Sequence, residues 1–127
     1  MTEVPEKQIV VSVETQFIED QSDPIDDRYV FSYTITIRNS GRKPAQLLTR
    51  HWIITDANGK VQEVKGKGVV GEQPNLRPGE AFRYTSGTML ETPVGSMRGS
   101  YGMVSSDGEM FDARIEQFIL SMPRTLH

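Results

Sequence analysis

The chain has no cysteine, and this absence excludes several kinds of chemistry at once. Disulfide frameworks, thiol catalysis and cysteine-ligated zinc or iron–sulfur sites all depend on that residue. The sequence also lacks any apolar run approaching the roughly 20 residues that a membrane-spanning helix needs. Its first residues, Met1 to Lys7, are polar and carry no apolar signal segment. These absences fit a reducing compartment, so we expect a cytoplasmic protein with no membrane insertion.

A surplus of basic charge is missing as well. The 127 residues include 14 basic and 17 acidic side chains, spread along the chain, for a net charge of -3. No basic stripe marks a nucleic-acid surface, and we expect no nucleic-acid partner. A chain of this length predicts one domain, residues 1–127, large enough to bury a core without a disulfide or a structural metal.

Helical periodicity is scarce, whereas the two-residue alternation of β-strands dominates. The clearest case is residues 29–38, where aromatic and β-branched residues alternate with serine, threonine and arginine. Alternation and turn signals, among them the hairpin signal Asn58-Gly59 that pairs residues 61–65 back as a short strand, predict strands at residues 9–17, 29–38, 45–56, 61–65, 82–88, 97–105 and 110–121. About seven strands separated by turn signals predict an all-β fold, an immunoglobulin-like antiparallel β-sandwich. An eight-stranded barrel satisfies the same strand count and is the alternative.

The third predicted strand, residues 45–56, has apolar residues of both parities, which indicates either a strand buried on both faces or a bulge. Trp52 stands where an immunoglobulin-like sandwich often buries a tryptophan. Alternation assigns most of the other aromatic residues to the core. Exposure of a cluster of them beside the glycine segment would instead indicate a partner groove. The aromatic residues concerned are Tyr29, Phe31, Tyr33, Phe82, Tyr84 and Tyr101.

Residues 66–71, Gly-Lys-Gly-Val-Val-Gly, fit the G-x-G-x-x-G pattern of dinucleotide-binding folds. In those folds the pattern opens a helix, and Pro74 and Pro78 disfavour a helix here. We therefore reject a Rossmann site and expect a long loop. Its glycines can serve the backbone alone, through positive φ and close approach. Alternatively, successive amides form a nest for phosphate, with charge from two lysines. The candidate phosphate-binding residues are Lys65, Gly66, Lys67, Gly68 and Gly71.

Other candidate sites are weaker. The acidic segment 19–27 offers oxygen ligands for a hard divalent cation, but it lacks the EF-hand pattern, and a solvated loop explains it as well. His51 and His127 do not make a convincing transition-metal site, and we expect His51 to be a satisfied, partly buried side chain. No G-x-S-x-G elbow occurs. We predict no metal site and no catalytic residues.

Three longer segments carry a resemblance to a known family. They are RYVFSYTITIRN (residues 28–39), RHWIITD (50–56, with Gly59 after it) and VKGKGVVGEQP (64–74). The match continues at single positions: Leu76, Pro78, Gly79, Glu80, Phe82, Tyr84, Ser86, Gly87, Thr92, Pro93, Gly95, Met97, Gly99 and Tyr101. Over almost the whole chain, these residues resemble the ApaG family.

The resemblance implies a fibronectin-type-III-like sandwich and no established enzyme activity. In bacteria it links the chain to cobalt tolerance and magnesium efflux, with a gene that commonly neighbours a diadenosine tetraphosphate hydrolase. Similar domains fused to F-box and DNA-polymerase-associated proteins of eukaryotes look like protein-interaction modules. We therefore expect a non-catalytic interaction module with an unidentified protein partner and no cofactor. The alternative is a nucleotide- or pyrophosphate-binding protein that uses the glycine segment.

Overall fold

Eight β-strands account for most of residues 4–123, the part of the chain that this computed structural model describes. The connection after the first strand contains two 3-10 turns, η1 (Glu19–Gln21) and η2 (Pro24–Asp26), where the sequence predicts a polar loop. In the described part, no helix is long and apolar enough to cross a membrane. The strands are β1 (Ile9–Phe17), β2 (Tyr29–Asn39), β3 (Ala45–Asp56), β4 (Val61–Lys67), β5 (Asn75–Leu76), β6 (Ala81–Leu90), β7 (Val94–Ser105) and β8 (Met110–Ser121).

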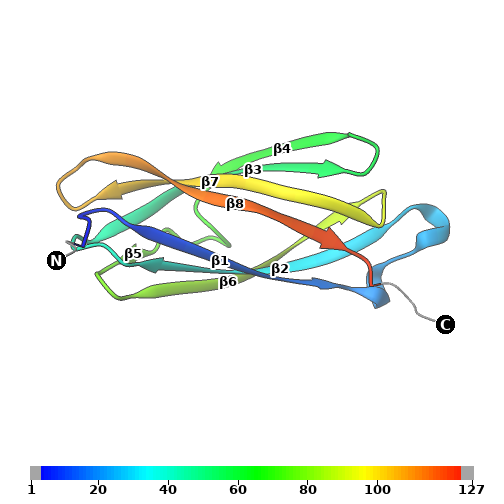
Figure 1. Ribbon diagram of the computed structural model, residues 1–127, viewed down its shortest axis with the longest axis horizontal. Coiled ribbons are helices and arrows are strands. Elements are labelled where there is room, and N and C mark those ends of the chain that lie inside the picture. The colour runs from blue at the N-terminus through cyan, green and yellow to red at the C-terminus, as the bar shows by residue number, and fades with distance from the viewer. Residues whose placement is uncertain (1–3, 124–127) are drawn as a thin grey trace.

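The strands form two antiparallel sheets that lie one over the other (Figure 1). One sheet has the order β1-β2-β6, and the other has the order β4-β3-β7-β8 with the short β5 beside β3. Two sheets with free edges make a sandwich, because a barrel would close its strands into one ring. The predicted β-sandwich is therefore confirmed and the barrel excluded. All seven predicted strands are present, and β5 is an additional two-residue strand.

Alternating residues of both sheets fill the space between the layers. In β2 every second side chain from Tyr29 to Ile37 is buried, as the alternation predicts. Trp52 is 2% exposed and its ring meets three others edge-on: Tyr33 at 5.4 Å, Phe118 at 5.9 Å and Tyr101 at 6.3 Å between centroids. Such contacts contribute about 0.5–1.5 kcal/mol each beyond the area that they bury. The expected buried tryptophan is confirmed.

Two β-bulges interrupt the larger sheet. The register of β3 against β7 shifts between Leu47 and Thr49. The bulge explains why an odd-numbered residue, Leu47, is buried before it and even-numbered residues, Trp52 and Ile54, are buried after it. A second shift separates Met97 from Gly99 of β7, where two residues of β8 stand opposite Arg98. A bulge bends the strand locally and redirects nearby side chains. At the second bulge, the exposed side chain of Arg98 lies on the face of the sheet that points away from the core.

The two long sides of the sandwich differ. On one side β1 and β8 lie close to each other and cover one another's edges. On the other side β4 and β6 are the outer strands, and each pairs with a single neighbour. The segment after β4 closes this second side by inserting Val69, which is fully buried. This side therefore brings the glycine segment and the edge of β4 together.

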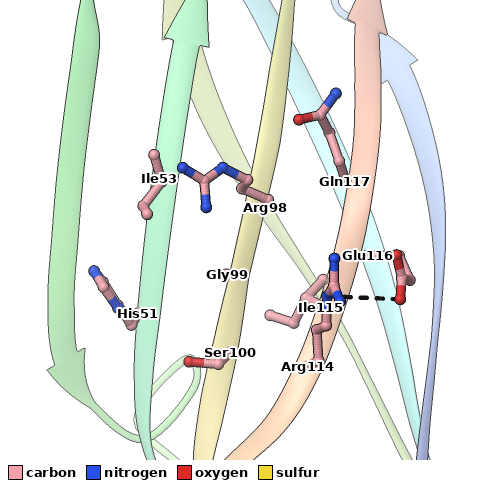
Figure 2. Close-up of a pocket in the computed structure, with 9 residues that line it drawn as sticks. All are labelled: His51, Ile53, Arg98, Gly99, Ser100, Arg114, Ile115, Glu116 and Gln117. Carbon is pink, nitrogen blue, oxygen red and sulfur yellow. Dashed lines mark ion pairs between the residues drawn. The ribbon is translucent and has the colours of Figure 1, made fainter.

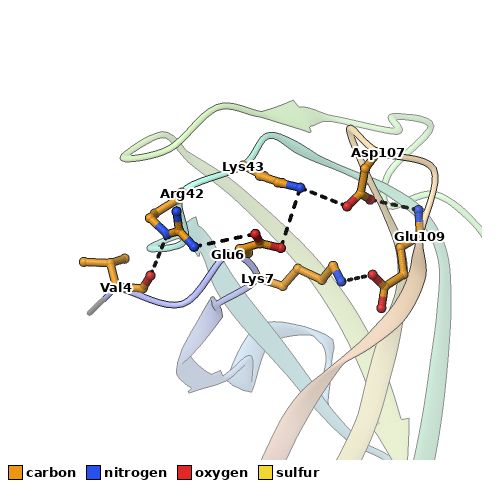
Figure 3. A network of polar contacts seen from close by, with 7 residues as sticks. All are labelled: Val4, Glu6, Lys7, Arg42, Lys43, Asp107 and Glu109. Carbon is orange, nitrogen blue, oxygen red and sulfur yellow. Dashed lines mark hydrogen bonds and ion pairs between the residues drawn. The ribbon is translucent and has the colours of Figure 1, made fainter. Parts of the chain in front are cut away.

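An ion-pair network ties the N-terminal segment to two turns at one end of the sandwich (Figure 3). Lys7 pairs with Glu109, and Lys43 bridges Glu6 at 3.6 Å and Asp107 at 3.0 Å. The Glu109 amide, followed by Lys43, lowers the pKa of Asp107 to about 2. Exposed ion pairs contribute little stability individually, so we infer that this network mainly holds the N-terminal segment against the two turns.

Candidate functional site

Gly66 and Lys67 belong to a strand. β4 continues to Lys67, two residues past the predicted end of the strand, so the expected loop is wrong at these two positions. Gly66 pairs with Arg50 of β3 and faces the interior beside it. A Cβ on Gly66 would come within 2.7 Å of the guanidinium carbon and of both terminal nitrogens of Arg50. Glycine gives the guanidinium group room to pack directly over the backbone, and a larger residue would displace the end of the Arg50 side chain.

Arg50 holds the end of β4 in place. Its Nη1 donates hydrogen bonds to the carbonyl oxygens of Lys67 at 3.1 Å and Gly68 at 2.9 Å. A guanidinium group carries five donors, and these two bonds use one of its nitrogens. Arg50 is half-buried on the inner face of β3, at the side of the sandwich that the glycine segment closes.

A tight turn follows, in which Val69 and Glu72 exchange two backbone hydrogen bonds of 2.8 and 2.9 Å. Val70 and Gly71 form its tip with φ values of 43° and 82°, the positive pair typical of a type I′ turn. Positive φ suits Gly71 but strains Val70, because a β-branched side chain clashes with the backbone in this region. The turn thus closes the side of the sandwich between β4 and β6, and Val70 at its exposed tip is strained.

The amides of this segment are only partly available to a ligand. Gly68 donates its N–H to the Leu48 carbonyl at 2.8 Å, and the amides of Val69 and Glu72 are used within the turn. No described residue accepts a hydrogen bond from the amides of Val70 and Gly71. The backbone nest that was the alternative reading of the whole glycine segment is therefore reduced to the two residues at the tip.

The two lysines of the predicted phosphate set lie elsewhere. Lys65 stands opposite His51 and Lys67 opposite Thr49, on the outer face of the sheet. Lys65 Nζ lies 3.5 Å from a carboxylate oxygen of Glu63, which also lies 2.7 Å from His51 Nε2. The hydrogen bond with His51, and next the charge of Lys65, lower the pKa of Glu63. The fold therefore distributes Lys65, Gly66, Lys67, Gly68 and Gly71 over three locations, and phosphate binding by this set stays a prediction.

A small cleft of about 160 Å³ lies where the turn meets the two sheets. Tyr33, Trp52 and Tyr84 line it but are only 6%, 2% and 7% exposed. The aromatic residues are therefore core residues, as alternation predicts, and they do not form an open groove. The hydroxyl of Tyr84, which lines the cleft, lies 2.5 Å from that of the fully buried Tyr101. Burial raises the pKa of Tyr84 to about 12 and that of Tyr101 further in the same direction.

The backbone of β4 has one free side. The hydrogen bonds from Asp56 N to Lys60 O and from Gly68 N to Leu48 O fix the pairing, so that even-numbered residues of β4 bond to β3. The amides and carbonyls of Val61, Glu63 and Lys65 consequently point away from the sheet. Within residues 4–123 no strand pairs with that edge. Sequence reasoning predicted this strand from the hairpin signal at Asn58 and Gly59 but did not identify its outer edge as free.

The acidic segment does not gather its carboxylates. Asp23 bridges to Arg28 through the backbone, and Asp27 has a left-handed conformation with φ of 52° at the end of η2. In the portion of the chain that is described, no group of three or more histidine, aspartate and glutamate side chains could hold a metal ion. His51 is half-buried and bonded to Glu63, as expected, whereas His127 lies outside the described residues.

Comparison with known proteins identifies the family. The family model of the ApaG domain matches residues 19–105. Protein ApaG of Thiobacillus denitrificans is 62% identical over 127 residues and all of both chains. The chain belongs to the ApaG family. Protein ApaG of Dechloromonas aromatica is 57% identical, again over all of both chains. The crystal structure of the ApaA protein from Bordetella pertussis superimposes with a TM-score of 0.94 at 52% identity, covering 97% of this chain and 100% of that one.

The ApaG relatives and the fold agree with the resemblance drawn from the sequence. Their names state no catalysed reaction. The family identity thus supports the sandwich. The function must be argued from the surfaces of this chain, because one fold carries many functions.

Proposed function

We propose that this ApaG-family protein is a non-catalytic binding module that recruits an extended segment of a partner protein to the free edge of β4. The observation that carries the proposal is the row of outward backbone groups of Val61, Glu63 and Lys65. An added strand forms main-chain hydrogen bonds with such a row, and its side chains supply the specificity.

Among the outer strands, β4 is the most accessible. The edges of β1 and β8 lie against each other. The turn that carries Val69 and Val70 meets β6 near Tyr84 and Ser86, where the four residues line one cleft. β4, by contrast, has no buried residue over its whole length. A partner segment therefore reaches the edge of β4 without displacing part of the fold.

The side chains of β4 define the chemistry of that partner. Val61 and Val64 are 60% and 37% exposed, one on each face of the sheet, and offer apolar contacts. Glu63 and Lys65 carry opposite charges on the outer face. Charge on an edge strand discourages indiscriminate pairing, so a segment with complementary charges is favoured over a second copy of β4. We infer a partner segment of alternating apolar and charged residues.

A proline variant tests the proposal. Glu63→Pro removes an outward amide and leaves the bonds from β4 to β3 intact, whereas Glu63→Ala removes the carboxylate and keeps the amide. A photo-crosslinking residue placed at Val61 should capture discrete partners in cells, and one at Val10 of β1, also exposed, serves as the positional control. We expect the Val61 adducts to disappear with Glu63→Pro and to persist with Glu63→Ala.

Two results would overturn the proposal. Identical adducts from Val61 and Val10 would show that capture is unspecific, and adducts that survive Glu63→Pro would show that the β4 edge is not used. Circular dichroism and amide spectra of both Glu63 variants establish that each is folded. Turnover of a nucleotide or polyphosphate by the purified protein would contradict the non-catalytic part.

The association of the family with cobalt tolerance and magnesium efflux fits this role as a proposal. A binding module can act on a cation transporter or its regulator without holding the metal itself. We place this activity in the cytoplasm, in keeping with the cysteine-free sequence.

The tip of the glycine turn supports a second candidate, the binding of pyrophosphate or a nucleotide phosphate. The uncommitted amides of Val70 and Gly71 are the observation that favours it. Amide shifts confined to residues 66–71 during a pyrophosphate titration at low salt would support this candidate. Unchanged amides at millimolar pyrophosphate would remove it.

A further inference from the structure

The outer face of the larger sheet carries a row of polar side chains that crosses all four of its long strands. Lys65 of β4 pairs with His51 of β3, His51 pairs with Ser100 of β7, and Ser100 pairs with Arg114 of β8. Directly opposed residues in antiparallel strands have Cβ atoms about 4.5–5.5 Å apart, so neighbours in the row can contact one ligand together. Arg98 lies two residues from Ser100 in β7 and extends the row into a patch.

The bulge in β8 hollows this patch. Glu116 and Gln117 stand together opposite Arg98, and the extra residue redirects the side chains around it. Gly99 lies between Arg98 and Ser100 and lines the hollow, and a Cβ on it would collide with the backbone of His51, so glycine lets β7 approach β3 closely here. The result is a hollow of about 340 Å³ lined by His51, Arg98, Gly99, Ser100 and Arg114, with Ile53 and three residues of β8. In Figure 2 the four polar side chains surround Gly99.

The charges around the hollow leave cationic groups available. Arg114 has an ion pair with Glu116, but its Nε is 3.6 Å from the carboxylate and both side chains are 81% exposed, so the pair is weak. Glu63 is engaged with His51 and Lys65 at the far end of the row. Within the described range, Arg98 has neither an ion pair nor a side-chain hydrogen bond. An anion over Gly99 can therefore bind the guanidinium group of Arg98, which has no partner among the described residues. It can also bind that of Arg114, whose weak pair with the solvated Glu116 is readily replaced.

We propose that this hollow is an anion site that takes the phosphate group of a small molecule, with Arg98 and Arg114 as its main ligands and Ser100 on its rim. Guanidinium groups match phosphate oxygens with paired donors, and a hydroxyl adds one more. Ile53, half-buried at the edge, offers an apolar wall for an organic group attached to the phosphate. The site is separate from the glycine turn and from the backbone edge of β4.

Titrations followed through the backbone amides test the site, with inorganic phosphate, pyrophosphate and AMP as probes at low salt. We expect shifts at Gly99, Ser100 and Arg114 that weaken as salt rises. Arg98→Gln and Arg114→Gln should each weaken binding about tenfold, the usual effect of losing a charge-assisted hydrogen bond. Arg83→Gln is the matched control, because Arg83 is an exposed strand residue of the other sheet with its own carboxylate partner, Glu14, at 3.4 Å.

The three probes distinguish the sources of the phosphate. Tighter binding of AMP than of inorganic phosphate would indicate a phosphorylated organic ligand in contact with Ile53, and equal binding would indicate the phosphate group alone. Shifts at Val70 and Gly71 without shifts around Gly99 would overturn the site. Equal losses in Arg98→Gln, Arg114→Gln and Arg83→Gln would also overturn it, because they would reflect net charge only.

Discussion

The hydroxyls of Tyr84 and Tyr101 share a hydrogen bond. We therefore predict that removing either hydroxyl lowers the free energy of unfolding by a different amount, and that the two losses are not additive. The two oxygens are 2.5 Å apart, Tyr101 is fully buried, and Tyr84 is 7% exposed beside the cleft. Tyr84→Phe leaves the Tyr101 hydroxyl without a partner and without water, which costs about 2–3 kcal/mol. Tyr101→Phe leaves the Tyr84 hydroxyl at the cleft, where water can replace the lost partner, so we expect about 1 kcal/mol.

The double variant should cost about 1 kcal/mol or less, because removing both hydroxyls leaves no orphaned polar group. Its cost would then be at least about 2 kcal/mol below the sum of the two single costs. Urea denaturation with linear extrapolation measures these differences. With about 2.1 cal/mol/K of unfolding entropy per residue over 127 residues, 1 kcal/mol corresponds to a shift of about 4 °C in Tm.

Tyr29→Phe is the control, because the Tyr29 hydroxyl has no hydrogen bond to a described side chain or backbone group, and its removal should change stability by less than about 0.5 kcal/mol. Additive costs of the two single variants would refute the reasoning. A larger cost for Tyr101→Phe than for Tyr84→Phe would refute the assignment of the water-accessible hydroxyl.

Two further predictions concern alkaline pH and the strained turn. Since burial raises the pKa of Tyr84 to about 12 and that of Tyr101 in the same direction, the unfolded chain releases these protons first. Stability from the pair should be fully present below about pH 10 and fall as pH rises toward 12. The urea midpoint should therefore decline over that range less steeply in the Tyr84→Phe/Tyr101→Phe variant; parallel declines would contradict this. Val70→Gly should raise the free energy of unfolding by up to about 1 kcal/mol, and the urea midpoint with it, because the relief of a positive φ outweighs the greater freedom of glycine in the unfolded chain. Val64→Gly, in the extended strand β4, should lower it, and a lower midpoint for Val70→Gly would show that the turn stores no strain.

The sequence predicted the strands well because their signals are local. Alternation in β2 depends on which residues face the core, and that property is fixed residue by residue along the strand. The apolar residues of both parities in β3 left two predictions open, and one of them, a bulge, is confirmed. The end of β4 was placed two residues early, because Gly66 has no side chain whose burial could signal a strand, and the guanidinium that packs over it comes from Arg50 of another strand.

The candidate sites were less predictable because they depend on distant pairings. Lys65 was selected for its place beside the glycines, but the register of β3 and β4 puts it in a row with His51 and Ser100. Arg98 and Arg114 lie 16 positions apart in the sequence and had no motif to connect them. The hollow that they share lies at the bulge in β8, and no local sequence pattern predicted that bulge.

The sequence by itself therefore determined the all-β class, the number of long strands, the buried Trp52 and the family, because these follow from local alternation and from residues in a specific order. Only the tertiary structure decided which edge stays open, which amides of the glycine turn remain available and which charges gather around Gly99. The physical reason is that strand register and sheet order bring together groups far apart in the chain. A single slip of register would send each of these side chains to the opposite face.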